Sequence, residues 1–408
     1  MRLLVVSQYF WPEDFRINDL VAELVARQHD VTVLTGLPNY PEGRISPAFL
    51  AAPRNFMSHA GARIVRVPLV PRGNGRFGLV LNYLSFAFNA SVFGTWRLRG
   101  QRFDAILVFA PSPITVALPA VLLRRLKCAP LLLWVLDLWP ETLEAVGAVR
   151  SPSLLRIVGK MVAFIYRHSD RILVQSRAFL GSVNQLAGDG ARSRYFPGWA
   201  EAVFREPTQP VELAPEVAAY GSTFNVLFAG SIGEAQDFPA ILDAADHLRH
   251  REDIRWLIVG DGRAAPAVRA EIQRRSLDHS VKMLGRHPIE RMPSFFKAAS
   301  ALLVSLKSNA VFSMTIPGKV QPYLAAGVPL VGMLDGEGAR VIEESGAGLV
   351  CSAGDGHALA LRVDQLSRLS RAERARMGEL GKAYAQREFD RDVLISRLDQ
   401  WLAEVAER

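Results

Sequence analysis

The sequence predicts an α/β protein made of two doubly wound, Rossmann-like domains with parallel sheets. Short, almost continuous apolar stretches alternate with amphipathic stretches of helical period, and this alternation occurs twice along the chain. A segment with four prolines and no periodicity, 195–221, separates the two series. Of the 408 residues, 50% are hydrophobic, which suffices for two large cores. Near-continuous apolar strands are typical of parallel sheets that helices cover on both faces.

The first series predicts an N-terminal domain over 1–200. Its first strand is followed by a helix in which apolar residues from Ile17 to Val25 recur on one face. A second amphipathic helix is expected over 154–168. The stretches expected to form strands are 2–9, 31–36, 62–70, 104–110, 130–139 and 171–176.

The second series predicts a domain over 201–385. The stretches expected to form its strands are 224–230, 254–260, 281–285, 301–306, 329–334 and 348–352. The last segment, 386–408, contains a helix after the second sheet is complete, and we expect it to cross back to the first domain. Two such domains leave a central cleft at the carboxyl ends of their sheets, where ligands bind.

Basic charge is concentrated in the first domain. Residues 1–200 hold 23 Lys and Arg but 12 Asp and Glu, and nine arginines with no acid lie between Glu42 and Asp104. Within that window, 77–96 carries no charged residue, but polar side chains make a spanning helix doubtful. The pattern favours contact of region 54–102 with an anionic membrane surface. A buried helix is the alternative, and without a recognition motif nucleic acid is not expected.

The two cysteines, Cys128 and Cys351, show neither a metal-ligand spacing nor a disulfide pattern. This favours a reducing compartment. The first apolar stretch is too short for a signal peptide, and acids follow it directly. We therefore expect it to be the first strand of the sheet.

Three glycine-containing turns follow strands of the second domain. They hold Gly230 with Ser231 and Gly233, then Gly260, and finally Lys319 after Pro317 and Gly318 in TIPGK. Glycines let backbone N–H groups approach a phosphate, and an anion would explain a lysine at a helix start. The turns match neither a P-loop nor a GxGxxG fingerprint. They predict a site for an anion, with ordinary strand-to-helix turns as the alternative.

The second half resembles the donor-binding half of family 4 glycosyltransferases, which have the GT-B architecture. The resemblance rests on FAGSIGEAQDF, IRWLIVGDG, VKMLGR, ALLVSL and TIPGKVQPYLAAGVPLV, and it covers essentially the whole chain. In detail, DLWPE, GEAQDFP and TIPGK are most similar to the L-fucosamine transferases of bacterial polysaccharide and O-antigen assembly.

The resemblance implies a donor site in which Lys319 pairs with a nucleotide diphosphate and Arg286 and His287 lie near the base. Preorganised donors would stabilise the charge that develops on the departing diphosphate. The residues implied to bind the donor are Gly230, Ser231, Gly233, Glu234, Gly260, Arg286, His287, Thr315, Ile316, Pro317, Gly318 and Lys319.

The first domain supplies the other candidate residues. Asp137 and Glu141, which follow a strand, are catalytic candidates together with Lys319. The loops after the first two strands hold the candidates for acceptor binding, which are Glu13, Arg16, Asn18, Asn39, Tyr40 and Arg44. A surface pair of Glu13 and Arg16 is the alternative. No metal or cofactor is expected.

The sequence departs from the family pattern at several places. Met314 and Pro322 stand where the family usually has two glutamates. Ser231 and Gln236 stand near an expected basic pair, and Leu136 replaces a common histidine. The departures put the family's contacts to the ribose and the sugar in doubt.

The resemblance implies a peripheral enzyme at the cytoplasmic face of the inner membrane. It would move an N-acetylated 6-deoxyhexose, such as N-acetyl-L-fucosamine, from a UDP-sugar to a lipid-linked saccharide, with retention of configuration. Two alternatives stay open. One is a non-catalytic nucleotide-sugar-binding or scaffold protein, which the missing glutamates would explain. The other is a UDP-sugar 2-epimerase on the same architecture.

Overall fold

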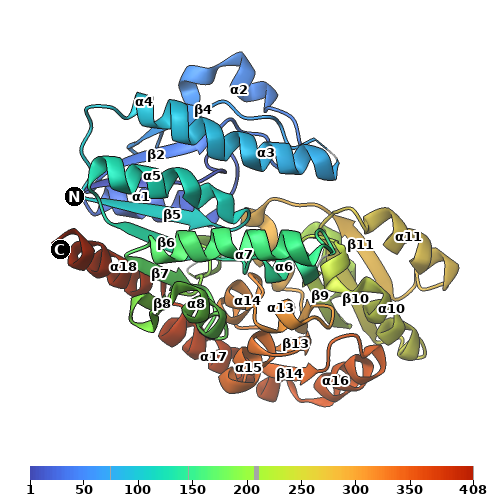
Figure 1. Cartoon of the computed structure of the whole chain (residues 1–408). Helices are drawn as coiled ribbons and strands as arrows, with labels where there is room; N and C mark the ends of the chain where they lie inside the picture. The colour runs from blue at the N-terminus through green and yellow to red at the C-terminus, as the bar shows by residue number, and fades with distance from the viewer. Residues whose placement is uncertain (74, 146, 206–210, 408) are drawn as a thin grey trace. The chain divides into compact units, whose positions relative to one another are not determined.

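The computed structural model describes residues 1–73, 75–145, 147–205 and 211–407 and divides into two compact units (Figure 1). Unit 1 comprises Met1–Phe196 and Asp392–Arg408, and unit 2 comprises Pro197–Arg391. These divisions lie within a few residues of the sequence-based domain boundaries at 200 and 385. Each unit is a sheet of mainly parallel strands with helices on it, as the alternation in the sequence predicts.

Unit 1 contains an eight-stranded sheet of order β3-β4-β2-β1-β5-β6-β7-β8, in which only the β3–β4 pair is antiparallel. The order reverses between β1 and β5, so the loops after these strands flank the crevice where doubly wound sheets bind ligands. The six predicted strands are confirmed, and the short β3 and β8 are additional. The strands are β1 (Arg2–Val6), β2 (Asp30–Gly36), β3 (Ser58–His59), β4 (Ala62–Val67), β5 (Ala105–Ala110), β6 (Leu131–Val135), β7 (Arg171–Val174) and β8 (Ser193–Tyr195).

The helices of unit 1 include one that returns from the C-terminus. α18 lies at the end of the chain and belongs to unit 1 (Figure 1). The centroids of its Trp401 ring and of the Phe196 ring are 6.0 Å apart, edge to face, and Glu404 pairs with Arg171 of β7 at 2.9 Å. The predicted crossover is confirmed. The helices are α1 (Arg16–Ala26), α2 (Pro47–Ala51), α3 (Arg76–Asn89), which the π-helical Ala90–Gly94 and α4 (Thr95–Arg97) continue, α5 (Ala117–Lys127), α6 (Glu141–Ala145), α7 (Pro152–Arg167), α8 (Phe179–Ala187) and α18 (Arg391–Ala406).

Unit 2 contains a fully parallel six-stranded sheet of order β11-β10-β9-β12-β13-β14. The order reverses between β9 and β12, so this sheet has its own switch point. All six predicted strands are confirmed. They are β9 (Phe224–Ala229), β10 (Ile254–Val259), β11 (Val281–Gly285), β12 (Ala301–Ser305), β13 (Leu330–Met333) and β14 (Gly348–Cys351).

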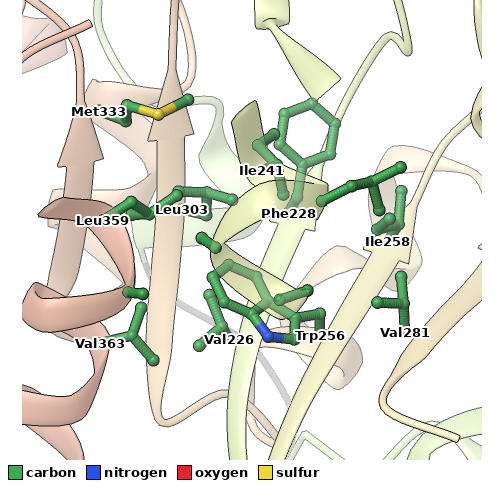
Figure 2. Packing of buried hydrophobic residues seen from close by; sticks show 14 of the residues in the cluster. Val226, Phe228, Ile241, Trp256, Ile258, Val281, Leu303, Met333, Leu359 and Val363 are labelled. Atoms are coloured by element: carbon green, nitrogen blue, oxygen red, sulfur yellow. The ribbon is translucent and has the colours of Figure 1, made fainter. Parts of the chain in front are cut away.

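The core of unit 2 fixes the strands that carry the candidate turns. Figure 2 shows Phe228, Trp256 and Ile258 from β9 and β10 packed with Ile241 and Leu359 from two helices. The apolar strands are buried because helices cover both faces of the sheet. The helices are α9 (Ala202–Arg205), α10 (Phe238–His247), α11 (Ala265–Arg274), α12 (Met292–Phe296), α13 (Ala310–Ser313), α14 (Val320–Ala326), α15 (Glu337–Ser345), α16 (Gly356–Arg368) and α17 (Arg371–Glu388).

The carboxyl ends of β9 and β10 approach so closely that only glycine fits there. A Cβ on Gly260 would lie 1.9 Å from the carbonyl oxygen of Gly230, and the φ of Gly260 is +147°. Gly260 also donates its N–H to the Gly285 carbonyl at 2.7 Å. The backbone contact therefore requires glycine at 260 for steric as well as conformational reasons.

We expect Gly260→Ala to destabilise unit 2 by about 2–4 kcal/mol, because the added carbon forces the two turns apart and strains the backbone. Denaturant unfolding followed by circular dichroism measures the change. Gly221→Ala is the matched control, since its Cβ would have its nearest atom at 3.8 Å and its φ is −63°. Equal stability of the two variants would contradict the proposed clash.

Candidate functional site

The turn after β9 is held in place by the neighbouring strand β12. Ser305 donates its hydroxyl to the Gln236 carbonyl at 2.8 Å, and the Lys307 N–H donates to the Ala235 carbonyl at 2.9 Å. Within the turn, the Gly233 N–H donates to the Gln236 side chain at 3.1 Å. Gly230, Ser231 and Glu234 are exposed, so this turn presents them at the switch point of the sheet.

A second set of backbone bonds joins the β9 turn to the β10 turn. The Ile232 N–H donates to the Asp261 carbonyl at 2.9 Å, and the Ala264 N–H donates to the Ile232 carbonyl at 3.0 Å. With the close approach of Gly260 to Gly230, these bonds make the two turns one rigid element. Rigid donors at a switch point are what a preorganised anion site requires.

The TIPGK segment lies between α13 and α14. Thr315 donates its hydroxyl to the Val311 carbonyl at 3.0 Å, and Ile316 and Pro317 are buried. Tyr323 fixes α14 on β9, because its hydroxyl accepts from the Ala229 N–H at 2.8 Å and donates to the Ala229 carbonyl at 3.0 Å. The next residue along β9 is Gly230, so this clamp brings the lysine of TIPGK beside the first glycine turn.

The Lys319 ammonium is buried beside Gly230 and has no hydrogen-bond partner among the described residues. Its Nζ lies 3.6 Å from the centroid of the Phe228 ring, and a Cβ on Gly230 would come within 3.3 Å of it. Burial lowers the pKa of this lysine to about 7. A buried cation without an anion is unfavourable, so the geometry marks a place where an anion would be stabilised.

The loop after β11 holds His287 in one orientation. Its Nε2–H donates to the Leu284 carbonyl at 2.9 Å, and its Nδ1 accepts from Arg291 at 2.8 Å. Arg291 in turn binds both carboxylate oxygens of Glu216. Both ring nitrogens of His287 are therefore already hydrogen-bonded within the protein. Its neighbour Arg286, which was also predicted to lie near the nucleotide base, is exposed.

In unit 1, Glu13 is a buried carboxylate that ties two loops together. It accepts from the backbone N–H groups of Asn39 and Tyr40, both at 2.7 Å, and of Phe10 at 3.2 Å. Burial raises its pKa to about 7, and the charge of Arg66 works against this rise. Glu13 is 6% exposed, so the alternative of a surface pair with Arg16 is wrong.

A buried amide network continues from the same loops. Asn82 of α3 donates to the side chain of Asn39 at 3.2 Å and accepts from Gln8 at 2.7 Å. Asn18 donates to the Glu13 carbonyl at 2.7 Å, and its own side chain accepts from the Trp11 N–H. These bonds give Glu13, Asn18 and Asn39 a positioning role.

The remaining predicted acceptor residues lie around this network. The Arg72 guanidinium lies 5.5 Å from the centroid of the Tyr40 ring, and both Tyr40 and Arg44 are exposed. Arg16, at the start of α1, is partly buried. Tyr40 and Arg44 are thus the members of the predicted acceptor set with exposed side chains, and an acceptor role for the whole set stays a prediction.

Asp137 and Glu141 lie after β6 in partly buried positions. Burial raises the pKa of Asp137, although Thr142 donates its hydroxyl to the carboxylate at 2.5 Å. One oxygen of Glu141 is buried without a partner among the described residues, as is the hydroxyl of Tyr166 on α7. Asp137 and Glu141 follow β6, the strand beside β5 at the switch point of unit 1, and their catalytic role stays a prediction.

Several residues of these sites were not predicted from the sequence. Arg66 donates to the carbonyls of Gly36 and Phe56 from within β4. An arginine inside the apolar stretch ARIVRV was the available signal for it. Phe228 and Asn82 gave no signal of their own, because their roles depend on partners far away in the sequence.

Two further observations limit what the sites can be. A cavity of about 1360 Å³ opens at the amino ends of the unit 1 strands, near Asp104, Pro130 and Asp170. The residues that line it include none of the predicted site residues. Among the described residues, no group of three or more His, Cys, Asp or Glu could hold a metal ion.

Both units match known protein families. Residues 15–199 match the Glycosyl transferase 4-like domain, and residues 223–368 match Glycosyl transferases group 1. The glycosyltransferase WbjE of Pseudomonas aeruginosa is 24% identical over 307 residues, which cover 73% of this chain and 75% of WbjE. The colanic acid biosynthesis glycosyl transferase WcaI of Escherichia coli K12 is 24% identical over 338 residues, covering 80% and 82%.

Solved glycosyltransferase structures share the fold of the chain. Sucrose-phosphate synthase of Thermosynechococcus elongatus superposes with a TM-score of 0.72 at 15% identity, covering 99% of both chains. HepE of Anabaena superposes with a TM-score of 0.70 at 13% identity, and the match again covers 99% of both chains. These are GT-B structures, so the fold expected from the sequence is confirmed. The chain is a glycosyltransferase, with a 4-like domain in its N-terminal half and a group 1 domain in its C-terminal half.

Proposed function

We propose that this glycosyltransferase transfers a sugar from a UDP-sugar to a lipid-linked saccharide during the synthesis of a cell-surface polysaccharide. The sugar we favour is an N-acetylated 6-deoxyhexose such as N-acetyl-L-fucosamine. The choice of sugar rests on the resemblance of DLWPE, GEAQDFP and TIPGK to the L-fucosamine transferases. The transfer is proposed to retain the anomeric configuration.

The buried, unpartnered ammonium of Lys319 is the single observation that carries the proposal. It lies beside the exposed glycine turn at the switch point of unit 2, where a nucleotide would bind. A diphosphate there would give the ammonium a charge-assisted partner, and the backbone N–H group of the exposed Ser231 follows directly in the same turn. The same donors would stabilise the diphosphate as it leaves the sugar.

The named relatives support the donor and the pathway class. HepE of Anabaena has been solved with UDP, with UDP and glucose, and with UDP-glucose. WcaI is named for colanic acid biosynthesis, and WaaG, another structure of the same fold, is involved in lipopolysaccharide biosynthesis. These relatives favour UDP as the nucleotide and a saccharide as the acceptor.

In the proposed transfer, the bond between the anomeric carbon and the UDP oxygen breaks, and a bond to an acceptor hydroxyl oxygen forms on the same face. The hydroxyl proton passes to the departing diphosphate oxygen. This scheme needs no enzymic nucleophile. It fits a donor site in which Met314 and Pro322 stand where the family usually has glutamates.

A lipid-linked acceptor places the enzyme at a membrane. We propose that it acts as a peripheral protein at the cytoplasmic face of the inner membrane, contacting anionic lipid through region 54–102. In that region, the partly buried Arg72 precedes and the exposed Arg99 follows a helix whose outer side chains are apolar. Positive charge beside exposed apolar groups is what binds a protein to such a surface.

Lys319→Ala is expected to weaken UDP binding by about 2–3 kcal/mol, because a charge-assisted hydrogen bond is lost from a buried site. Calorimetric titration with UDP, GDP and UDP-sugars measures it. Lys382→Ala is the control, since Lys382 forms an exposed ion pair with Glu379. Unchanged UDP affinity in folded Lys319→Ala would remove the diphosphate assignment. No nucleotide binding by the wild type would instead favour the scaffold alternative.

UDP binding is expected to weaken as the pH rises above 7. In the free protein the pKa of Lys319 is about 7, and a bound diphosphate would raise it, so binding takes up a proton above pH 7. Affinity is then fully present below that value and falls by up to about tenfold per pH unit above it. Titration at pH 8 in two buffers of different ionisation enthalpy measures the uptake. Uptake that persists in Lys319→Ala would contradict this origin.

Lys319→Met is expected to stabilise the unliganded protein at pH 7 by roughly 2 kcal/mol. The folded-state pKa of about 7 lies below the ordinary value of 10.5, so wild-type stability rises as the pH increases between these values. The variant lacks this rise. Thermal unfolding at pH 7 and pH 9 tests both statements, with Lys382→Met as the exposed control. A variant less stable than the wild type at pH 7 would show that the ammonium has a partner.

A further inference from the structure

One face of the unit 1 sheet is covered by α3, α5 and α7, which lie side by side. α5 contacts both α3 and α7, as Figure 1 also shows. α3 leads from β4 across the sheet to β5, α5 leads from β5 to β6, and α7 leads from β6 to β7. Right-handed crossovers in this direction put all three helices on the same face. We refer to α3 with its continuation to Arg97, α5 and α7 as the helical face.

Large apolar side chains point outward along the helical face. On α3 and its continuation, Phe77 is 76% exposed, Phe88 66% and Trp96 59%. On α7, Ile157 is 63% exposed. A helix that faces water normally carries polar residues there, and monomeric proteins rarely expose a large contiguous apolar patch. The other exposed apolar residues of this face are Val80, Leu81, Leu84, Val92, Phe93, Leu122, Leu126, Leu154 and Phe164.

The same three segments contain basic residues and no acid. The whole chain has 40 Asp and Glu, yet none falls within 76–97, 117–127 or 152–167. Long basic side chains next to exposed apolar groups can place their charge at lipid headgroups while their stems cover hydrocarbon. Of the eight basic residues in these segments, Arg124 pairs with Asp170 at 2.7 Å and Lys127 donates to the carbonyls of Leu98 and Gln101. The exposed ones are Arg97, Arg125, Arg156, Lys160 and Arg167.

α3 with its continuation is long and apolar enough to cross a membrane by length and composition alone. Its inner side, however, is bonded to the loops of the sheet. The buried Asn82 donates to the Val70 carbonyl at 2.6 Å and accepts from Gln8, and Asn89 donates to the Pro68 carbonyl at 2.9 Å. A spanning α3 would draw strands into hydrocarbon, where lipid-exposed strand edges are not tolerated.

We infer that the helical face docks on an anionic lipid bilayer, with α3 lying in the plane of the interface. This inference rests on the proposed function, in which the acceptor is anchored in that bilayer. The proposed function places lipid contact in region 54–102, which contains α3. The inference here is that α5 and α7, which lie outside that region, contact the bilayer as well. The exposed apolar side chains enter the boundary of headgroups and acyl chains, while the exposed basic side chains meet lipid phosphates.

Flotation of the full chain with vesicles tests the inference. Equal parts of phosphatidylglycerol and phosphatidylcholine are compared with phosphatidylcholine alone. Ile157→Ser with Phe164→Ser is expected to lower the partition coefficient on anionic vesicles by about tenfold, since two apolar anchors are lost. Arg156→Gln with Lys160→Gln and Arg167→Gln is expected to lower it by on the order of a hundredfold.

The controls remove the same kinds of side chain elsewhere. Leu361→Ser with Leu380→Ser removes two exposed apolar residues from helices of unit 2 and is expected to leave partitioning unchanged. For charge, the control changes three exposed arginines of unit 2, which are Arg269, Arg371 and Arg376, to Gln. Calorimetric titration with UDP on each preparation reports the donor site separately, so a failure of the proposed function appears there and not in flotation.

Several outcomes would overturn the inference. The α7 variants could float like the wild type, or the unit 2 controls could lose binding equally. Equal binding to neutral vesicles at all salt concentrations would remove the anionic partner. Resistance of the bound protein to alkaline extraction would indicate a spanning α3. A stable dimer that the α7 variants dissociate, with no vesicle binding, would make the helical face an interface between copies.

Discussion

The burial of the Lys319 ammonium without an anionic partner is the constraint on which the unit 2 site depends. Its Nζ rests on the Phe228 ring, Tyr323 clamps α14 to β9, and Gly230 leaves out the Cβ that would crowd the nitrogen. Each arrangement keeps the cation dry and close to the switch point. A ring face offsets only part of the lost hydration, so the arrangement is favourable as a whole when an anion completes it.

The buried carboxylate of unit 1, Glu13, differs from Lys319 because it has partners within the protein. Glu13 is also withdrawn from water, but three backbone N–H groups and the nearby Arg66 satisfy its carboxylate. A buried charge whose hydrogen bonds are all made within the protein stabilises the loops that it joins. A buried charge without a partner is stabilised only when a ligand of opposite charge binds. This contrast separates the two candidate sites more clearly than burial or pKa does. It gives Glu13 a structural role and makes Lys319 the candidate for ligand binding in the proposed function.

The sequence predicted the strands of both sheets and the returning helix α18, because continuous apolar runs and helical periodicity are local signals. It also predicted the three glycine turns of unit 2. It could not predict that Arg66 would approach Glu13, 53 residues away, or that His287 would be held by Arg291 and Leu284. Those facts depend on tertiary packing. The sequence also could not predict the exposed apolar residues of α7, because a helical period does not show which neighbours cover each side of the helix.

The absence of the two family glutamates explains why the Lys319 ammonium has no partner among the described residues. Pro322 is buried in α14 and Met314 is partly buried. Because neither side chain has a carboxylate, these two positions offer none near the TIPGK turn. A carboxylate beside Lys319 would pair with it and raise its pKa, and the turn would then be nearly neutral before a nucleotide arrived. Without one, Lys319 keeps a pKa of about 7 in the free protein, and in the proposed function a bound diphosphate would raise that pKa and receive the charge of the ammonium. In a low-dielectric site the effect of that charge is greatest when charge develops on the leaving group. In the proposed function, the departure from the family pattern therefore shifts the chemistry of this site from paired acids toward a single buried cation.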